Sequence, residues 1–378
     1  MEETPVASIT EHWSKLEDPR GDCGKRHQLI EIISIAVCAV ICGADSWVDV
    51  ELFGNSKKEW LKTFLGLPHG IPSHDTFGKV FALLDARQFQ DRFMDWVQAV
   101  NEVTKGQLVA IDGKTIRRSH DRFIGKAAIH MVSAWASANH LLLGQTKTDA
   151  HSNEITAIPE LLKMLEVSGC IVTIDAMGCQ TEIARTIVDQ GADYALALKK
   201  NQGQLYEDVK DLFEYERKEG FEDVDYDFHR TVNKGHGRIE TRQCWAISEP
   251  DHLRYLNKNN KWSKLTSIVM VEAERLVDGE TSVESRYYIS SLPNNAKALL
   301  EATRGHWGIE NRVHWVLDVA FREDESRVRK GSAEENLATL RRMALNLIKH
   351  ETTSKGGVAA RRKRAGWDED YLLKVLSP

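Results

Sequence analysis

Val109-Ala110-Ile111-Asp112-Gly113 and Val172-Thr173-Ile174-Asp175-Ala176 are two short β-type runs, each ending in an aspartate that a small residue follows. Further strand-like and helical runs alternate around them, at 127–136, 141–148, 154–166, 180–190 and 194–198. This succession predicts an α/β fold in which helices cover a mixed sheet. Ligands gather beyond the carboxyl ends of strands in such sheets, so Asp112 and Asp175 would stand side by side if their strands are neighbours. The small residue after each aspartate would leave room for a ligand to approach the backbone.

The rest of the chain divides around this core. The first hundred residues read as helical, and one helix after 203 precedes strand-like runs near 224–233, 238–248, 266–276 and 282–291. Helices resume at 296, and Gly356-Gly357 opens a stretch that we expect to be flexible. The expected units are an N-terminal helical domain (1–105), a first part of the core (106–203), a β-rich insertion (204–285), a second part of the core (286–350) and a basic C-terminal tail (351–378).

Composition excludes several classes of protein. The chain has 378 residues, 42% of them hydrophobic, which is typical of a globular protein and excludes disorder, collagen and coiled-coil arrays. The net charge of −6 argues against a uniformly basic coat protein for nucleic acid. Residues 341–378 nevertheless carry nine Lys or Arg against four Asp or Glu, so this segment is +5 and the remainder −11. A basic segment on an acidic body hints at contact with a polyanion.

We expect a cytoplasmic protein without a membrane span. The longest apolar run, Leu29–Ala44, has 16 residues and is interrupted by Glu31 and Ser34, whereas a span needs about 20 apolar residues. It therefore predicts a buried helix. The beginning of the chain lacks the pattern of a signal peptide. The six cysteines form no Cys-x-x-Cys pair, which favours reduced thiols over a zinc ribbon.

Two neighbouring carboxylates would repel each other. Such a pair shares a proton, pairs with cations or holds a metal. Mg²⁺ prefers oxygen ligands and typically takes one or two carboxylates together with water and phosphate oxygens. The competing interpretation, that Asp112 and Asp175 simply end their strands and start turns, stays open at this point.

A third acid lies on a later helix. The segment Arg304–Trp315 has a helical pattern despite two glycines. At 100° per residue, one stripe of this helix carries His306, Glu310, His314 and Asp318. A solvated polar face is the alternative interpretation. Zinc catalysis is disfavoured because the His-Glu-x-x-His spacing of metalloproteases is absent.

Two aspartates on core strands, a later glutamate and an intervening β insertion are typical of a two-metal site for phosphoryl transfer. Two Mg²⁺ ions about 4 Å apart clamp the attacking and leaving oxygens of a displacement at phosphorus. A side-chain nucleophile is then unnecessary, and the sequence has neither a Gly-x-Ser-x-Gly elbow nor a Walker loop.

The sequence resembles the H-repeat-associated (ISAs-type) transposases of bacterial insertion sequences, which are relatives of the insertion-sequence-4-like DDE enzymes. The likeness runs from about residue 15 to 375. The stretches that carry it are Ile71–Phe77, Ala110–Thr115, Ser152–Leu162, Asp175–Gln180, Gly235–Arg238, His306–Asn311, His314-Trp315 and Leu317–Val319.

The resemblance implies a ribonuclease-H-like core with the acidic triad Asp112, Asp175 and Glu310 as catalytic residues and ligands of Mg²⁺, for which Mn²⁺ could substitute. It implies cleavage of double-stranded DNA at the ends of an insertion sequence and transfer of the freed strand to target DNA. A homodimer in the DNA complex is expected because two ends must be brought together. The wider superfamily places Tyr, Arg and Lys around its glutamate, where this sequence has Thr303, His306 and Leu317. Asp318 and Glu154 are the alternates should Glu310 not be the third acid.

Candidate DNA contacts are basic and polar residues near these acids and in the turn of the insertion, where glycines allow close backbone approach. They are Lys114, Lys199, Lys200, Asn201, Lys234, His236, Arg238, Arg304, His306, Asn311 and His314. The cluster Arg361–Arg364 would add salt-dependent attraction that is independent of sequence. Two other functions remain as alternatives, namely a domesticated, catalytically silent DNA-binding protein that keeps the transposase fold, and an Asp/Glu glycosidase.

Overall fold

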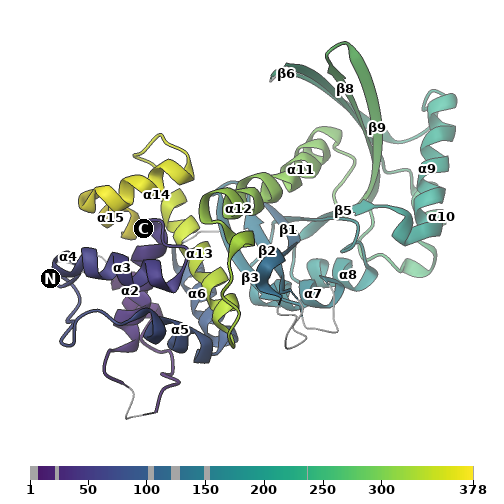
Figure 1. The fold of residues 1–378 in the computed structure, drawn as a ribbon. Helices are drawn as coiled ribbons and strands as arrows, with labels where there is room; N and C mark the ends of the chain where they lie inside the picture. Colours follow the sequence, from purple (N-terminus) through teal and green to yellow (C-terminus); the bar gives the residue numbers. More distant parts are fainter. Residues whose placement is uncertain are drawn as a thin grey trace.

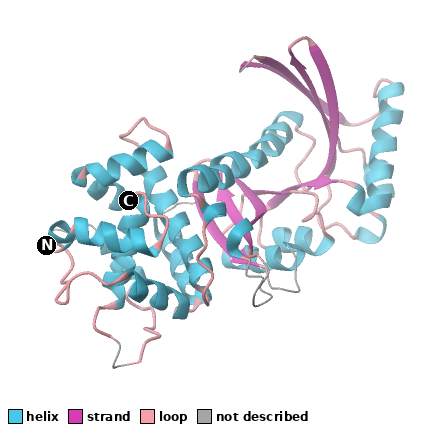
Figure 2. Cartoon of the chain, viewed as in Figure 1, coloured by secondary structure: helices cyan, strands magenta, loops and turns pink. Residues whose placement is uncertain are grey.

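A helical body and a helix-covered sheet lie side by side in this protein (Figure 1). The computed structural model describes residues 7–21, 25–100, 106–120, 128–148, 154–235 and 237–377. Figure 2 shows that the strands are confined to one half of the molecule, from which a long curved β ribbon projects. The predicted α/β class is confirmed.

Five strands form the centre of the sheet. These are β1 (Leu108–Thr115), β2 (His130–Ala136), β3 (Leu141–Lys147), β4 (Ile171–Ile174) and β5 (Asp193–Leu198), in the order β3-β2-β1-β4-β5. β1, β4 and β5 run parallel, whereas β2 and β3 are antiparallel. The parallel strands are nearly continuous apolar runs because helices cover both of their faces. This order and these directions confirm the ribonuclease-H-like prediction.

The β-rich insertion extends the same sheet. Its strands are β6 (Tyr226–Gly235), β7 (Arg238–Ile247), β8 (Ser267–Val277) and β9 (Glu280–Ser290), and β9 pairs antiparallel with β5. The result is a sheet of nine strands in the described part of the chain. The turn between β8 and β9 uses Asp278 and Gly279 with φ of 50° and 86°, as a two-residue hairpin requires. Helices α9 (Gly203–Lys218) and α10 (Pro250–Leu256) accompany the ribbon.

Helices cover both faces of the central strands (Figure 1). On one face lie α7 (Glu154–Met164) and α8 (Thr181–Asp189), and on the other α11 (Ala296–Ile309) and α12 (Trp315–Phe321). The two glycines within α11 explain its close approach to the sheet. A Cβ atom on Gly305 would overlap Leu108 of β1, and one on Gly308 would overlap the Trp135 ring of β2.

The helical body is built from helices at the beginning and at the end of the chain. It comprises α1 (Ala7–Trp13), α2 (Leu29–Ile41), α3 (Trp47–Ser56), α4 (Lys58–Leu61), α5 (His74–Leu83), α6 (Ala86–Val100), α13 (Ala333–His350), α14 (Val358–Trp367) and α15 (Glu369–Leu376). The buried helix predicted from the apolar run is α2, which packs against α1, α3, α13 and α14. In the described residues, no helix is both long and apolar enough to cross a membrane. The five described cysteines carry free thiols, and Cys23 lies outside the described residues.

The prediction of a flexible basic tail is wrong. Residues 358–376 form α14 and α15, because apolar side chains such as Leu372 are buried against the rest of the helical body. Arg362 is only 4% exposed, and its guanidinium donates hydrogen bonds to the carbonyls of Val40 and Ala320 and lies over the Phe321 ring. Arg362 is therefore part of the core and unavailable for DNA.

A buried ion network ties the sheet to the helical body. Glu323 and Arg342, both 0% exposed, form an ion pair of 2.7 Å, and Lys114 of β1 lies 3.0 Å from the second oxygen of Glu323. Burial alone raises the pKa of Glu323, but the cations of Arg342 and Lys114 outweigh it and hold that pKa at about 2. Lys114 also bonds Asp318 of α12. The network thus joins β1, α12 and α13.

Glu323→Gln should destabilise the protein by about 3–5 kcal/mol, because it leaves buried cations without their anion. Glu325→Gln is the matched control, since Glu325 lies two residues away in an exposed pair with Arg322 and should cost less than about 1 kcal/mol. The measurement is urea unfolding at pH 7. Because the folded pKa of Glu323 lies below the ordinary 4.5, its contribution is present above pH 4.5 and is lost towards pH 2. Equal unfolding midpoints for the two variants would refute the assignment.

Candidate active site

The three predicted acids line one cavity of about 620 Å³, which lies at the carboxyl end of β4 and beside Asp112 within β1. The register pairs Ile111 with Ile174, so Asp112 and Asp175 each come directly after a paired residue of adjacent parallel strands. Glu310 reaches the same cavity from the end of α11. The expectation that the two strands are neighbours is confirmed, although Asp112 lies inside β1 and not at its end.

Each acid has a distinct setting. Asp175 is fixed by its own turn, because its Oδ1 accepts the backbone N–H groups of Met177 at 3.0 Å and Gly178 at 3.4 Å. The Oδ2 of Asp112 lies 3.4 Å from Nδ1 of His314. Glu310 is exposed and begins a five-residue π-helical turn, Glu310–His314. Such turns are rare and occur frequently at functional sites.

The predicted polar stripe faces the sheet. His306 Nδ1 lies 3.2 Å from the Thr173 hydroxyl of β4, His314 contacts Asp112, and Asp318 bonds the ammonium group of Lys114. The alternative of a solvated polar face is therefore wrong for these three side chains. The π-helical turn between Glu310 and His314 adds one residue to that turn of the helix, which leaves the glutamate in the cavity while the histidine is buried.

The pKa values of both aspartates in this cavity are raised. Burial, together with the charges of Asp175, Glu154 and Glu310, raises the pKa of Asp112 to about 7. Burial and the charge of Glu154 also raise the pKa of Asp175. The nearby histidines do not neutralise these acids, because burial lowers the pKa of His306 to about 4 and that of His314 to about 3.

Glu154 is the acid whose position the sequence did not reveal. It begins α7, and its Oε1 lies 2.7 Å from Nε2 of His130, whose other nitrogen lies 2.8 Å from the Thr115 hydroxyl. A Cβ on Gly113 would overlap both Glu154 and His130. The expectation that this glycine makes room for a ligand is therefore wrong, because it makes room for a fourth acid. Glu154 lies across β1 from the helix that carries Glu310.

The residues present fit a divalent cation that ligands from a substrate would complete. Among the described residues, no group of three or more His, Cys, Asp or Glu side chains converges closely enough to hold a metal by itself. Asp112 and Asp175, however, line the same cavity, and burial and neighbouring acids raise the pKa of both carboxyl groups. Mg²⁺ commonly uses one or two carboxylates with water and phosphate oxygens, so this pair suits it.

Several predicted DNA contacts border this cavity. Lys199, Lys200 and His306 line it directly. Arg238, Arg304 and Asn311 line an adjoining groove of about 370 Å³. The structure therefore brings these six predicted residues to two adjoining depressions.

Other predicted contacts do not lie there. Lys114 is buried in its ion network, and His314 is buried beside Asp112. Asn201 donates its side-chain N–H to the carbonyl of Ala176, so it fixes the turn after β4. Lys234 pairs with Ile239 and thus points to the face of the ribbon opposite Arg238. His236 lies outside the described residues, as do Ser152 and Asn153 of the motif before α7.

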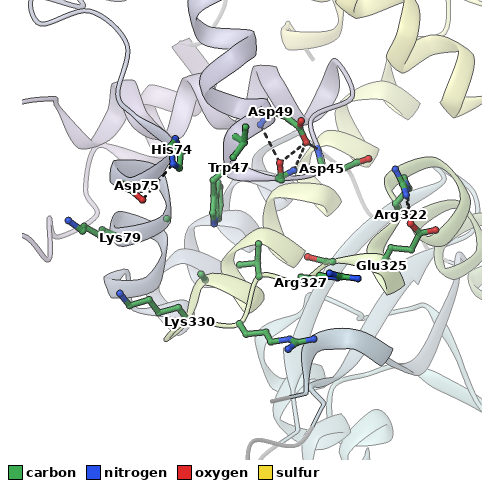
Figure 3. A pocket seen from close by; sticks show the side chains of 17 residues that line it. Asp45, Trp47, Asp49, His74, Asp75, Lys79, Arg322, Glu325, Arg327 and Lys330 are labelled. Atoms are coloured by element: carbon green, nitrogen blue, oxygen red, sulfur yellow. Dashed lines mark hydrogen bonds and ion pairs between the residues drawn. The ribbon is translucent and has the colours of Figure 1, made fainter. Parts of the chain in front are cut away.

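A second cavity lies in the helical body, away from the acids. It measures about 690 Å³ and lies between α3, α5 and the segment 322–333, with Trp47 on its wall (Figure 3). Its carboxylates have structural tasks, since Asp49 accepts the N–H and hydroxyl of Ser46 and Glu325 pairs with Arg322. This cavity lacks the three acids, and we do not place the active site there.

Comparisons with known proteins agree with this arrangement. Residues 104–347 match the family described as Transposase DDE domain, and residues 10–97 match the family described as DDE_Tnp_1-associated. "Putative transposase YncI" of Escherichia coli O157:H7 is 41% identical over 375 residues, which cover 98% of this chain and 95% of the relative. "H repeat-associated putative transposase YhhI" of Escherichia coli (strain K12) is 36% identical over 376 residues, which cover 98% of each chain. A solved piggyBac transposase synaptic complex with hairpin DNA superposes with a TM-score of 0.47 and 11% identity, over 95% of this chain and 75% of that one.

A core with two acids on adjacent parallel strands and a third on a later helix is that of a DDE transposase. The chain belongs to this family, and over nearly its whole length it is similar to the H-repeat-associated transposases. The resemblance noted from the motifs is confirmed.

Asp112→Asn should stabilise the metal-free protein by about 1–3 kcal/mol at pH 8. The folded pKa of Asp112, about 7, exceeds the ordinary 3.8, so its favourable contribution is present below pH 3.8 and lost as the pH rises through 7. The gain should therefore shrink at pH 5, where the native carboxyl is protonated. The measurement is thermal unfolding in EDTA, with the exposed Asp211→Asn as control. A larger gain at pH 5 than at pH 8 would contradict the assigned repulsion.

Glu154→Gln should lower the pKa of Asp112, because the charge of Glu154 helps to raise it. Carboxyl ¹³C chemical shifts followed over pH 4–9 would measure the change. Glu160→Gln, on an exposed position of the same helix, should leave the titration unaltered. An unchanged Asp112 titration in the Glu154 variant would place Glu154 outside the site.

Proposed function

We propose that this chain is a Mg²⁺-dependent transposase that cuts double-stranded DNA at the ends of an insertion sequence and joins the freed 3′ end to target DNA. The observation that carries the proposal is the shared cavity of Asp112, Asp175 and Glu310. Membership of the DDE transposase family supports it. The same family membership argues against the alternative of an Asp/Glu glycosidase.

Within this proposal, Asp112, Asp175 and Glu310 hold the divalent cations. When bound, these ions activate the attacking hydroxyl and neutralise charge on the departing oxygen. Asp175 is pre-oriented by two backbone N–H groups, so little rearrangement is needed on that side. His306 and His314 stay neutral at pH 7, which leaves the acids free to bind cations.

Phosphate attraction falls to the cations on the rim. Lys199 and Lys200 are exposed beside the acids, and Arg286 closes the same cavity from β9. A phosphodiester entering the cavity would meet these cations before the carboxylates. We place the reaction in the cytoplasm and expect a homodimer on DNA, because two ends must be held together.

Asp112→Asn and Glu310→Gln should bind labelled element ends as tightly as the wild type but cut them at least about 10²-fold more slowly in Mg²⁺, because each removes a cation ligand. Gel assays of strand cleavage and of joined products are the measurement, and Mn²⁺ should support the wild-type reaction. Asp211→Asn is the control for charge. Cleavage at the wild-type rate by Asp112→Asn would remove this residue from the mechanism.

The second candidate is a catalytically silent DNA-binding protein that retains the fold. It is favoured by one observation, that in the described residues the acids do not converge as a complete metal-ligand group. Tight binding of element ends without cleavage in Mg²⁺ or Mn²⁺ would support it. The presence of all three acids in one cavity favours the active enzyme.

A further inference from the structure

The β ribbon of the insertion has two chemically different faces. Strand alternation and register place Arg238, Glu240 and Arg242 of β7 on one face, together with Arg275 of β8 and Arg286 of β9. The other face presents Glu272 and Glu274 of β8 and packs against α9, where Arg217 pairs with Glu272 at 3.0 Å. Four of the five arginines in the strands of the ribbon thus lie on one face, and Arg230 of β6 lies on the other.

The arginine face forms a groove with α11. Arg304 of α11 and Asn311 of the π-helical turn that follows it line the opposite wall. The groove adjoins the cavity of the acids, because Thr303, Trp307 and Arg286 line both. At this junction the Arg286 guanidinium lies 4.8 Å from the centre of the Trp307 ring, which is 44% exposed. A linear ligand in the cavity could continue directly into the groove.

The groove has more positive charge than its own acids can neutralise. Its lining contains five arginines and two acids, Glu240 and Glu284, a surplus of three positive charges. Glu240 is 7% exposed and is shared by Arg275 at 3.0 Å, Arg238 at 3.3 Å and Arg242. One buried terminal nitrogen of Arg242 has no partner among the described residues. A purely structural ion-pair cluster would not need this surplus.

We propose that this arginine groove binds the sugar-phosphate backbone of the DNA that adjoins the phosphodiester in the acid cavity. Guanidinium groups suit this task because their paired N–H donors match two phosphate oxygens. Glu240 already holds Arg238, Arg242 and Arg275 in a fixed arrangement. These side chains therefore lose less rotational freedom when DNA binds. The inference rests on the proposed function, and it assigns Arg242, Arg275 and Arg286 to DNA.

The test compares arginines on opposite faces of the ribbon. Arg275→Ala removes one charge from the groove, and Arg230→Ala removes one from the opposite face, since exposed Arg230 pairs with Gln243. Binding of the full chain to a fluorescent element-end duplex is measured by anisotropy over a range of salt concentrations. The slope of log affinity against log salt is negative. Its magnitude should decrease by about 0.9 for Arg275→Ala and by about 1.8 for the double variant with Arg242→Ala and Arg275→Ala. Arg230→Ala should retain the wild-type slope.

Glu240→Gln keeps the test decisive if the double variant fails to fold. It frees the arginines from their anion and should tighten DNA binding severalfold, whereas a groove without DNA would give no change. Thermal unfolding checks that each variant is folded. Affinity and slope equal to the wild type in Arg275→Ala and Glu240→Gln would overturn the inference.

The outcome separates this inference from the proposed function. A wild-type protein that never cleaves, but whose binding depends on Arg275 and not on Arg230, would refute the enzymatic proposal and support the groove. A wild-type protein that cleaves DNA, but binds it equally well after Arg275→Ala and after Arg230→Ala, would support the enzymatic proposal and refute the groove.

Discussion

The repulsion between Asp112 and Asp175 is the constraint on which the rest of this site depends. Parallel pairing of β1 and β4 places Asp112 and Asp175 directly after the paired residues Ile111 and Ile174, so the sheet holds their backbones side by side. Burial strengthens the repulsion because little water screens it, and the pKa of Asp112 rises to about 7 as a result. Without bound cations, a fold that holds such a pair together is less stable than the same fold with the repulsion neutralised.

The surroundings preserve this negative charge. Lys114 lies two residues after Asp112, yet its ammonium group is engaged by Asp318 and Glu323. His314 contacts Asp112 but is kept neutral by burial, and Asp175 receives backbone N–H groups, which orient a carboxylate without supplying a full charge. Lys114 and His314 therefore support the structure and do not neutralise Asp112. The buried network of Glu323 and Arg342 also anchors α12, which follows the turn that carries Glu310.

The sequence predicts the parts of this site that depend on periodicity. Matched β runs ending in aspartate place two acids, and the helical stripe of His306, His314 and Asp318 faces the sheet as its spacing indicates. Features that depend on distant contacts escape prediction. The partners of Lys114 lie more than 200 residues away, and the burial of Arg362 follows from packing against α2. The density of charged residues along the sequence predicts neither the ion pairs of Lys114 nor the burial of Arg362.

Strand parity accounts for another failure of sequence reasoning. Lys234 and Arg238 flank one turn, which suggested a joint phosphate contact, but hairpin register sends them to opposite faces. Glu154 was predicted as an alternate third acid, but its position was not, since the glycine that accommodates it is adjacent to Asp112 in sequence and faces the other side of β1. In both cases the side-chain direction decides the role, and this direction is known only once the register is known.

If the chain acts on DNA as we propose, the division of charge between the cavity and the groove resolves a conflict. Three carboxylates at the reaction point repel a phosphodiester, and the repulsion extends over a screening length of about 8 Å at physiological salt. The arginine face of the ribbon lies directly beside that point, since both depressions share Arg286 and Trp307. The arginine face of the ribbon can then attract the DNA, while the three carboxylates serve the reaction. The insertion, which pairs with β5 as part of the same sheet, fixes the distance between them.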